Sequence, residues 1–193
     1  MPWEKQFNVD ETLDKAMRSF WSKGYAATPL EVLVADMGIK RGSIYATYGD
    51  KRSLFIESLR RYEERYRKDF LKAVARDRSP REVIFLVFKE AVDAALSDDS
   101  RNGCFLVNTA LELAPHDSEI AAIVSEGLLD TERFFRRVIR KGQKTGEISP
   151  DLDGNSVARA LLGLMSGLRV LARARPEAKL LRAIQDQACV LLG

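Results

Sequence analysis

Apolar residues recur every three or four positions along almost the whole chain, which is the spacing of one face of an α-helix. The first such stripe consists of Val9, Leu13, Ala16, Met17 and Phe20. No run of alternating apolar and polar residues, the pattern of a half-buried strand, reaches a useful length. The sequence therefore predicts an all-α fold of about nine helices.

Start and stop signals divide the first part of the chain into short helices. Gly24 fits the end of the first helix, because glycine readily adopts the conformation that ends helices. Thr28, followed by a proline and three positions later by Glu31, predicts the N-cap of a second helix. A tight turn leads to a third helix over 42–48, and a fourth helix runs to about residue 76.

Beyond Pro80 the expected helices become longer and more apolar, and prolines fall in the breaks between them. They cover about 80–97, 103–114, 117–144, 153–173 and 177–192. Two short helices joined by a glycine-containing turn, with a supporting helix before them, have the dimensions of a helix-turn-helix unit. We therefore expect a helix-turn-helix domain over 1–52 and a larger helical bundle over 53–193.

Composition narrows the class of protein. The 193 residues are 46% hydrophobic and 31% charged, which suffices for a folded core. No long apolar run predicts a membrane span and no apolar leader predicts secretion, so we expect a cytoplasmic protein. Two cysteines and one histidine are too few for a disulfide framework or a zinc site, and we expect no metal or cofactor. A formal net charge of +3 permits nucleic-acid binding without requiring it.

Charged residues alternate along the expected fourth helix, which is typical of a solvated face with salt bridges. The basic members are Arg60, Arg61, Arg65, Arg67 and Lys68, and the acidic members are Glu57, Glu63 and Glu64.

The segment 24–55 carries the most specific pattern in the chain, GYAATPLEVLVADMGIKRGSIYATYGDKRSLF. Its ordered features are an aromatic-rich end of the first helix, the Met37-Gly38-Ile39 turn, the run Gly42-Ser43-Ile44-Tyr45, and Asp50-Lys51 before Leu54-Phe55. In these features the chain resembles the TetR family of tetracycline-repressor-like transcriptional regulators. The resemblance implies a helix-turn-helix domain that binds double-stranded operator DNA and a C-terminal ligand-binding and dimerisation bundle.

A recognition helix places its first residues against base edges in the major groove of DNA. Lys40 and Arg41 stand at the start of the third helix, and Arg41 can bond a guanine through two hydrogen bonds. Gly42 lets the backbone approach the duplex, and Thr47 can offer its methyl group or its hydroxyl to a base. The resemblance supports these roles, and the expected phosphate contacts are Thr28, Ser43, Tyr45, Tyr48 and Lys51. The family more often carries Phe at the position of Tyr48.

By the same resemblance, the middle helices hold a small-molecule effector. Such sites are mostly apolar cavities with a few polar groups. An aromatic stripe at helical spacing fits a packed core equally well, so both interpretations stay open. The expected ligand-binding residues are Phe85, Phe88, Phe105, Asn108, Thr109, Glu112 and Phe134, with Phe135 beside them.

The last two helices carry more apolar residues than one core face needs, and Gly163 and Gly167 allow close helix approach. A single helix-turn-helix unit reads little DNA, so we expect a homodimer formed through these two helices. A purely intramolecular core is the alternative.

The most direct hypothesis is a ligand-responsive transcriptional regulator, a repressor that a small molecule releases from its operator. Cys104 supports an alternative, a redox- or electrophile-sensing regulator, because a helix N-terminus favours the reactive thiolate. A cysteine that only packs in the interior is the competing interpretation. A helical adaptor that binds protein also remains open. We do not expect an enzyme, because one histidine and no catalytic motif leave little for acid–base chemistry.

Overall fold

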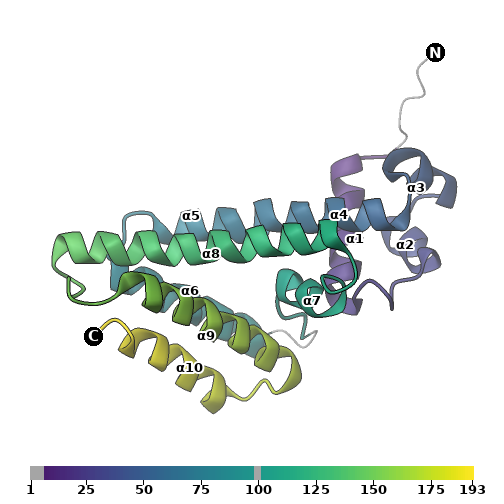
Figure 1. Ribbon diagram of the computed structural model, residues 1–193. Helices are drawn as coiled ribbons and strands as arrows, with labels where there is room; N and C mark the ends of the chain where they lie inside the picture. Colours follow the sequence, from purple (N-terminus) through teal and green to yellow (C-terminus); the bar gives the residue numbers. More distant parts are fainter. Residues whose placement is uncertain (1–6, 98–100) are drawn as a thin grey trace.

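The computed structural model describes residues 7–97 and 101–193, which form an elongated, all-helical molecule (Figure 1). Helices α1 (Val9–Lys23), α2 (Leu30–Met37) and α3 (Arg41–Tyr48) gather at one end. From that end, α4 (Lys51–Tyr62), the π-helical turn η1 (Glu63–Lys68) and α5 (Asp69–Ala75) run on without a break. They form one long helix, as the sequence predicted.

The remaining helices build the larger part of the molecule. They are α6 (Pro80–Ser97), α7 (Phe105–Glu112), α8 (Ser118–Thr145), α9 (Gly154–Ala174) and α10 (Ala178–Val190). In Figure 1, α8 runs alongside the long helix, and α6, α9 and α10 lie beneath both. With α4, η1 and α5 counted as one helix, the described residues contain nine helices and no strand, which confirms the all-α prediction. Within these residues, no helix has the length and apolarity needed to cross a bilayer.

Two apolar cores hold these helices together. The first core includes Phe20, Phe55 and Phe105, and it joins α1–α4 to α7 and to the beginning of α8. The second core includes Phe88 and Phe135, and it joins α5, α6, α8, α9 and α10. The first core therefore includes residues on both sides of residue 52, where we expected the boundary between the two domains. Residue 52 itself lies near the start of the continuous long helix.

The helix ends follow the sequence signals with one exception. Gly24 ends α1 with a φ of 86°, and Asp50 caps α4 by accepting a hydrogen bond from the Ser53 amide. The prediction that Thr28 caps α2 is wrong, because Pro29 occupies the N-cap position. The Thr28 side chain is fully buried, and its hydroxyl donates to the Gly24 carbonyl at 2.5 Å. It thus satisfies a carbonyl at the end of α1 rather than an amide at the start of α2.

The prediction of a solvated face along the long helix is wrong for two arginines and for Glu63, which is 7% exposed. The Arg61 side chain is 10% exposed because α1 packs on α4, and its Nε lies 2.8 Å from an Asp14 carboxylate oxygen. The Arg61 hydrogen bond lowers the pKa of Asp14. The Arg67 side chain is 11% exposed, and its Nη2 lies 2.5 Å from the Glu63 carboxylate one turn earlier. Arg60 and Arg65 are exposed, as expected.

Gly127 brings α8 into close contact with η1 and α7. A Cβ atom at this position would lie 2.6 Å from a Glu63 carboxylate oxygen and 2.8 Å from Leu106 Cδ2. Both distances are shorter than van der Waals contact, so the absence of a side chain sets how closely the three elements pack.

We expect Gly127→Ala to destabilise the fold, although alanine is the better helix former. Overpacking of this kind costs about 1–3 kcal/mol, which corresponds to a loss of roughly 2–12 °C in Tm for a chain of this size. Thermal unfolding followed by circular dichroism measures the change. Ser125→Ala, on the exposed face of the same helix, is the matched control and keeps the original Tm. A Tm for Gly127→Ala equal to that of the control would contradict the close packing.

Candidate functional site

Helix α3 presents one exposed face at the end of the molecule. Arg41, Gly42, Tyr45 and Ala46 are exposed along it, whereas Ile44 lies in the first core. Lys40, just before the helix, is exposed as well, and Ser43 and Thr47 lie half-buried on its flanks. The structure thus brings together most of the predicted DNA contacts. Ala46, which was not among the predicted contacts, lies on the same face because it follows Gly42 by four residues.

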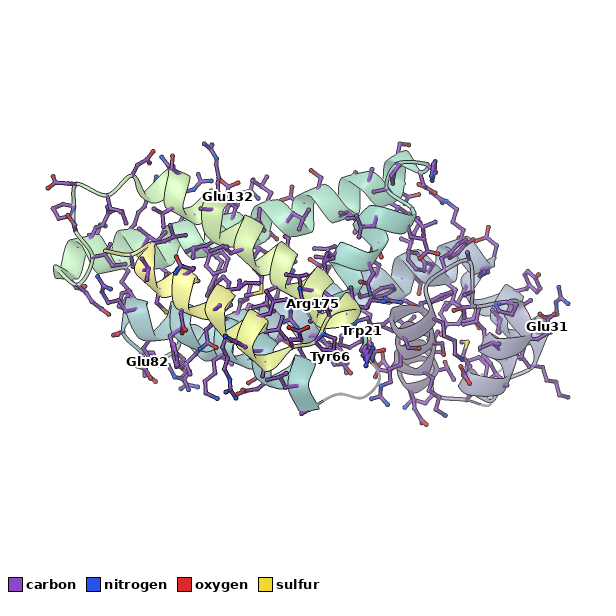
Figure 2. The ribbon with its side chains drawn as sticks, turned by 90° about the horizontal axis from the view of Figure 1, so that it is seen from below. Trp21, Glu31, Tyr66, Glu82, Glu132 and Arg175 are labelled. Carbon is purple, nitrogen blue, oxygen red and sulfur yellow. The ribbon has the colours of Figure 1, made fainter. Side chains whose placement is uncertain are left out.

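Arg41 projects from this face as a charged side chain. Its guanidinium lies 5.8 Å from the centre of the Tyr45 ring, one turn along the helix. The neighbouring Tyr45 side chain raises the pKa of Arg41 further above its ordinary value. The Glu31 carboxylate is 3.6 Å away, but both partners are mostly exposed, so this ion pair contributes little. Figure 2 shows Glu31 at the extreme end of the molecule. The Arg41 side chain beside it is 62% exposed.

Two predicted phosphate contacts are wrong because their hydroxyls serve the interior. Tyr48 is 5% exposed, and its hydroxyl donates to the Val9 carbonyl at 3.3 Å and lies 3.2 Å from Thr12 Oγ1. Burial raises the pKa of Tyr48. Thr28 is 0% exposed, so it has no surface on which to meet a phosphate. Both phosphate contacts were predicted because these side chains carry a hydroxyl. The residue type alone does not reveal whether the side chain points into the interior.

The beginning of α2 supplies other donors for an anion. No side chain caps α2, and the amides of Val32 and Leu33 donate to the Pro29 carbonyl. The amides of Leu30 and Glu31 are therefore the ones that remain for an anion, at the positive end of the helix dipole. Lys51 also lies nearby, half-buried, with its ammonium 4.2 Å from the centre of the Tyr25 ring. It donates to the Tyr25 carbonyl at 2.7 Å, and burial lowers the pKa of Lys51.

A cavity of about 90 Å³ lies farther along the molecule, between the long helix and helices α7, α8 and α9. Figure 2 shows Tyr66, which lines it, beside Trp21 at the junction with the first helices. The other lining residues are Tyr62, Arg67, Phe70, Leu71, Val87, Cys104, Leu106, Val107, Leu128, Thr131, Phe135, Leu162, Met165, Ser166 and Arg169.

None of the seven predicted ligand-binding residues lines this cavity. Phe85 is 40% exposed, and Phe88 and Phe105 are packed into the two cores. Phe134 lines a separate outer groove of about 400 Å³ between α5 and α8. Only its neighbour Phe135 reaches the inner cavity. Helical spacing identified inward faces correctly in most cases, but it does not distinguish the wall of a cavity from a filled core.

The polar residues predicted for the pocket form hydrogen bonds to loop and helix backbone atoms instead. Thr109 is buried, and its hydroxyl donates to the Phe105 carbonyl at 2.8 Å within α7. Asn108 donates to the Asn102 carbonyl at 2.9 Å, in the loop before the helix. These bonds satisfy polar groups that would otherwise be buried without partners.

Glu112, at the end of α7, reaches across to the loop between α1 and α2. Its carboxylate accepts hydrogen bonds from the backbone amides of Tyr25 at 3.1 Å and of Ala26 at 2.8 Å. Gly24 lies beside the same carboxylate, and its φ of 86° favours glycine at this position of the loop. Glu112 therefore connects α7 to the helix-turn-helix unit rather than binding in the cavity.

Cys104 is the N-cap residue of α7, as its sequence context predicted, and it lines the cavity. The Tyr62 hydroxyl donates to its sulfur at 3.5 Å. Cys189 lies in α10, and burial raises the pKa of its thiol, which disfavours the reactive thiolate. Among residues 7–97 and 101–193, no three His, Cys, Asp or Glu side chains gather as a metal site requires.

Comparisons with known proteins agree with this geometry. Residues 13–57 match the family model for bacterial regulatory proteins of the tetR family, and residues 80–187 match the tetracyclin repressor-like C-terminal domain. The HTH-type transcriptional repressor ComR of Escherichia coli (strain K12) is 32% identical over 170 residues, which cover 88% of this chain and 81% of that protein. The uncharacterized HTH-type transcriptional regulator YezE of Bacillus subtilis (strain 168) is 29% identical over 190 residues, covering 98% and 96%.

Solved structures show the same arrangement of helices. A cysteine mutant of the TetR family regulator CifR, complexed with 26-bp double-strand operator DNA, superimposes with a TM-score of 0.87. It is 28% identical, and the match covers 98% of both chains.

The two tyrosines of α3 provide a matched test of this site. We expect Tyr48→Phe to lower the free energy of unfolding by about 1 kcal/mol, because the Tyr48 hydroxyl is hydrogen-bonded in the interior. Tyr45→Phe leaves stability unchanged and weakens DNA binding about 3–10-fold, because its exposed hydroxyl is free for a phosphate. Urea denaturation and fluorescence anisotropy on a DNA site selected from a random-sequence library measure the two effects. The reverse pattern would contradict the assigned orientations.

Proposed function

The chain is a member of the TetR family of DNA-binding transcriptional regulators, and on that premise we propose that it is a homodimeric repressor that leaves its operator when a small molecule fills the inner cavity. The exposed face of α3, with Arg41 at its start, is the observation that supports DNA recognition most directly. In this proposal the chain acts by binding DNA rather than by catalysis. It does so in the cytoplasm, which contains the operator DNA.

The DNA contacts divide into two kinds. Arg41 and the exposed small residues of α3 face base edges, since a guanidinium bonds guanine through two hydrogen bonds and small residues allow close approach. Lys40, Ser43, Tyr45 and Lys51 contact phosphate, with Thr47 at the flank of the helix. The amides of Leu30 and Glu31, at the start of α2, take the phosphate role that was predicted for Thr28.

Dimerisation supplies the second recognition helix. The outer faces of α9 and α10 keep apolar side chains in solvent, with Val170 40% and Val190 65% exposed. Among the described residues, a Cβ atom on Gly163 or Gly167 would meet nothing within 4 Å beyond the backbone of its own helix. These glycines are therefore not needed for packing within the subunit, which supports an interface with a second copy. Two such subunits would read half-sites about 34–36 Å apart, or a multiple of this distance.

Two structural connections support coupling between the cavity and the DNA-binding end. The long helix carries Tyr62 at the cavity and begins at Lys51, directly after α3. Helix α7 carries Cys104 at the cavity and ends at Glu112, which holds the α1–α2 loop. A ligand that moves either helix changes the position of α2 and α3. The operator affinity then falls by a factor equal to the ratio of the ligand's affinities for the DNA-free and the DNA-bound conformations.

Modification of Cys104 is a second candidate signal, because the thiol lies in the cavity at one end of α7. The similar regulator CifR was solved as a cysteine mutant on its operator DNA. A group added to the Cys104 sulfur would occupy the same space as a bound effector and act through the same helix.

We expect operator binding with two chains per site and an affinity that falls steeply as salt rises, because phosphate contacts release counterions. Arg41→Ala raises the operator Kd about 5–150-fold, the effect of losing a two-bond contact to guanine. Fluorescence anisotropy on the upstream region of the gene and on sites selected from random DNA measures both. Equal affinity for selected and unrelated DNA would contradict the proposal.

If Cys104 is a sensor, hydrogen peroxide or an electrophile such as N-ethylmaleimide weakens operator binding, and Cys104→Ser removes the response. Cys189→Ser serves as the control and keeps the response. An equal response of the wild type and Cys104→Ser would exclude this second signal.

A further inference from the structure

The inner cavity contains a positive charge that no described carboxylate balances. Two arginines and no acidic residue line it. Arg67 is neutralised by Glu63, 2.5 Å away. Arg169, by contrast, has no carboxylate oxygen within 4.0 Å among residues 7–97 and 101–193. Arg169 is half-buried, and a positive charge with no neighbouring carboxylate in the described part of the chain favours an anion.

Further hydrogen-bond donors converge on the same end of the cavity. The Tyr62 hydroxyl is directed at the Cys104 sulfur, a weak acceptor, at 3.5 Å. Burial and the nearby Cys104 thiol raise the pKa of Tyr62, while Arg169 and the Phe105 amide act in the opposite direction. Tyr62 and Arg169 both line the cavity. Donors outnumber strong acceptors here.

The rest of the cavity is apolar and small. Its wall includes Phe70, Leu71, Leu128, Phe135, Leu162 and Met165. The volume of about 90 Å³ is well below the 150 Å³ or so that holds a benzene molecule in another protein. Without rearrangement it therefore accommodates about four to six non-hydrogen atoms.

We infer that the cavity binds a small monocarboxylate, whose carboxylate group accepts hydrogen bonds from Arg169 and Tyr62 and whose short hydrocarbon chain packs against the apolar wall. This inference rests on the proposed function, since it specifies the effector of the same cavity. A neutral ligand would add no negative charge beside Arg169, which has no carboxylate partner within the part of the chain that the structure describes. A phosphate would bring nearly two negative charges to one unbalanced guanidinium and has no apolar part for the remaining wall.

Calorimetric titration with straight-chain acids of about two to four carbons, near neutral pH where carboxylates are ionised, tests the inference. Each acid is compared with its primary amide, which has nearly the same shape and no charge. We expect at least one acid to bind, and its amide to bind at least tenfold more weakly.

Arg169→Gln lowers affinity for that acid at least tenfold and leaves the amide unchanged, whereas Arg169→Lys keeps most of the affinity. Arg159→Gln, an exposed arginine elsewhere on α9, is the matched control and binds as the wild type does. If Arg169→Gln unfolds, Tyr62→Phe tests the same site through its second donor, with a loss of severalfold. Equal binding of acid and amide, an unchanged affinity in both variants, or no binding of any acid would overturn the inference.

The calorimetric measurements of ligand binding do not require DNA, so they test the ligand class separately from the proposed release of the operator. An acid that binds through Arg169 but leaves the operator Kd unchanged supports the ligand class and contradicts the proposed release. Release of the operator by a neutral compound alone supports the proposed function and overturns the carboxylate inference.

Discussion

The apolar core around Phe55 and Phe105 makes the DNA-binding end and the cavity parts of one packed unit. The Phe105 ring lies 5.3 Å from that of Phe55 and 5.7 Å from that of Tyr62, in edge-to-face contact with both. Phe55 in turn contacts Phe20 of α1, and Tyr62 borders the cavity. Because packed cores change between discrete arrangements rather than bending gradually, a shift at Tyr62 is expected to alter how the first helices sit.

The π-helical turn adds a second element at the same place. Tyr62 and Tyr66 stack with their ring centres 5.9 Å apart, just before and within η1, and both line the cavity. Glu63, in the same turn, is buried beneath Gly127 and paired with Arg67. π-Helical turns are uncommon and often occur at functional sites. Here the turn lies where a ligand would contact the helix that leads back to α3.

The overall architecture could be predicted from the sequence because it depends on local patterns. Helix spacing, the glycine after α1 and the cap at Asp50 all follow from the residues nearby. The DNA-recognition face was largely predicted for the same reason. Once the first residue of a helix is known, the helical repeat determines which side chains share its exposed face. Thr28 and Tyr48 were misplaced because the partners of their hydroxyls, Gly24 and Val9, are set by the packing of α1 against its neighbours.

The cavity could not be predicted in this way. Its walls come from helices distant in sequence, and a void depends on how completely their side chains fill the space between them. Phe88 and Phe135 have the same residue type and stack on each other, yet only Phe135 borders the void. The sequence around Arg169 does not single it out, because its interest comes from the lack of a carboxylate partner among the described residues, which depends on the packing of distant helices.

The central claim is that occupation of the cavity weakens operator binding. It can be tested without knowing the natural effector, by alkylating Cys104 with iodoacetamide in a Cys189→Ser background and confirming complete modification by mass spectrometry. The operator Kd is then measured by anisotropy before and after modification. The account predicts a rise of at least tenfold, which Cys104→Ser prevents. An unchanged Kd in the fully modified protein would show that the cavity and the DNA-binding helices are not coupled.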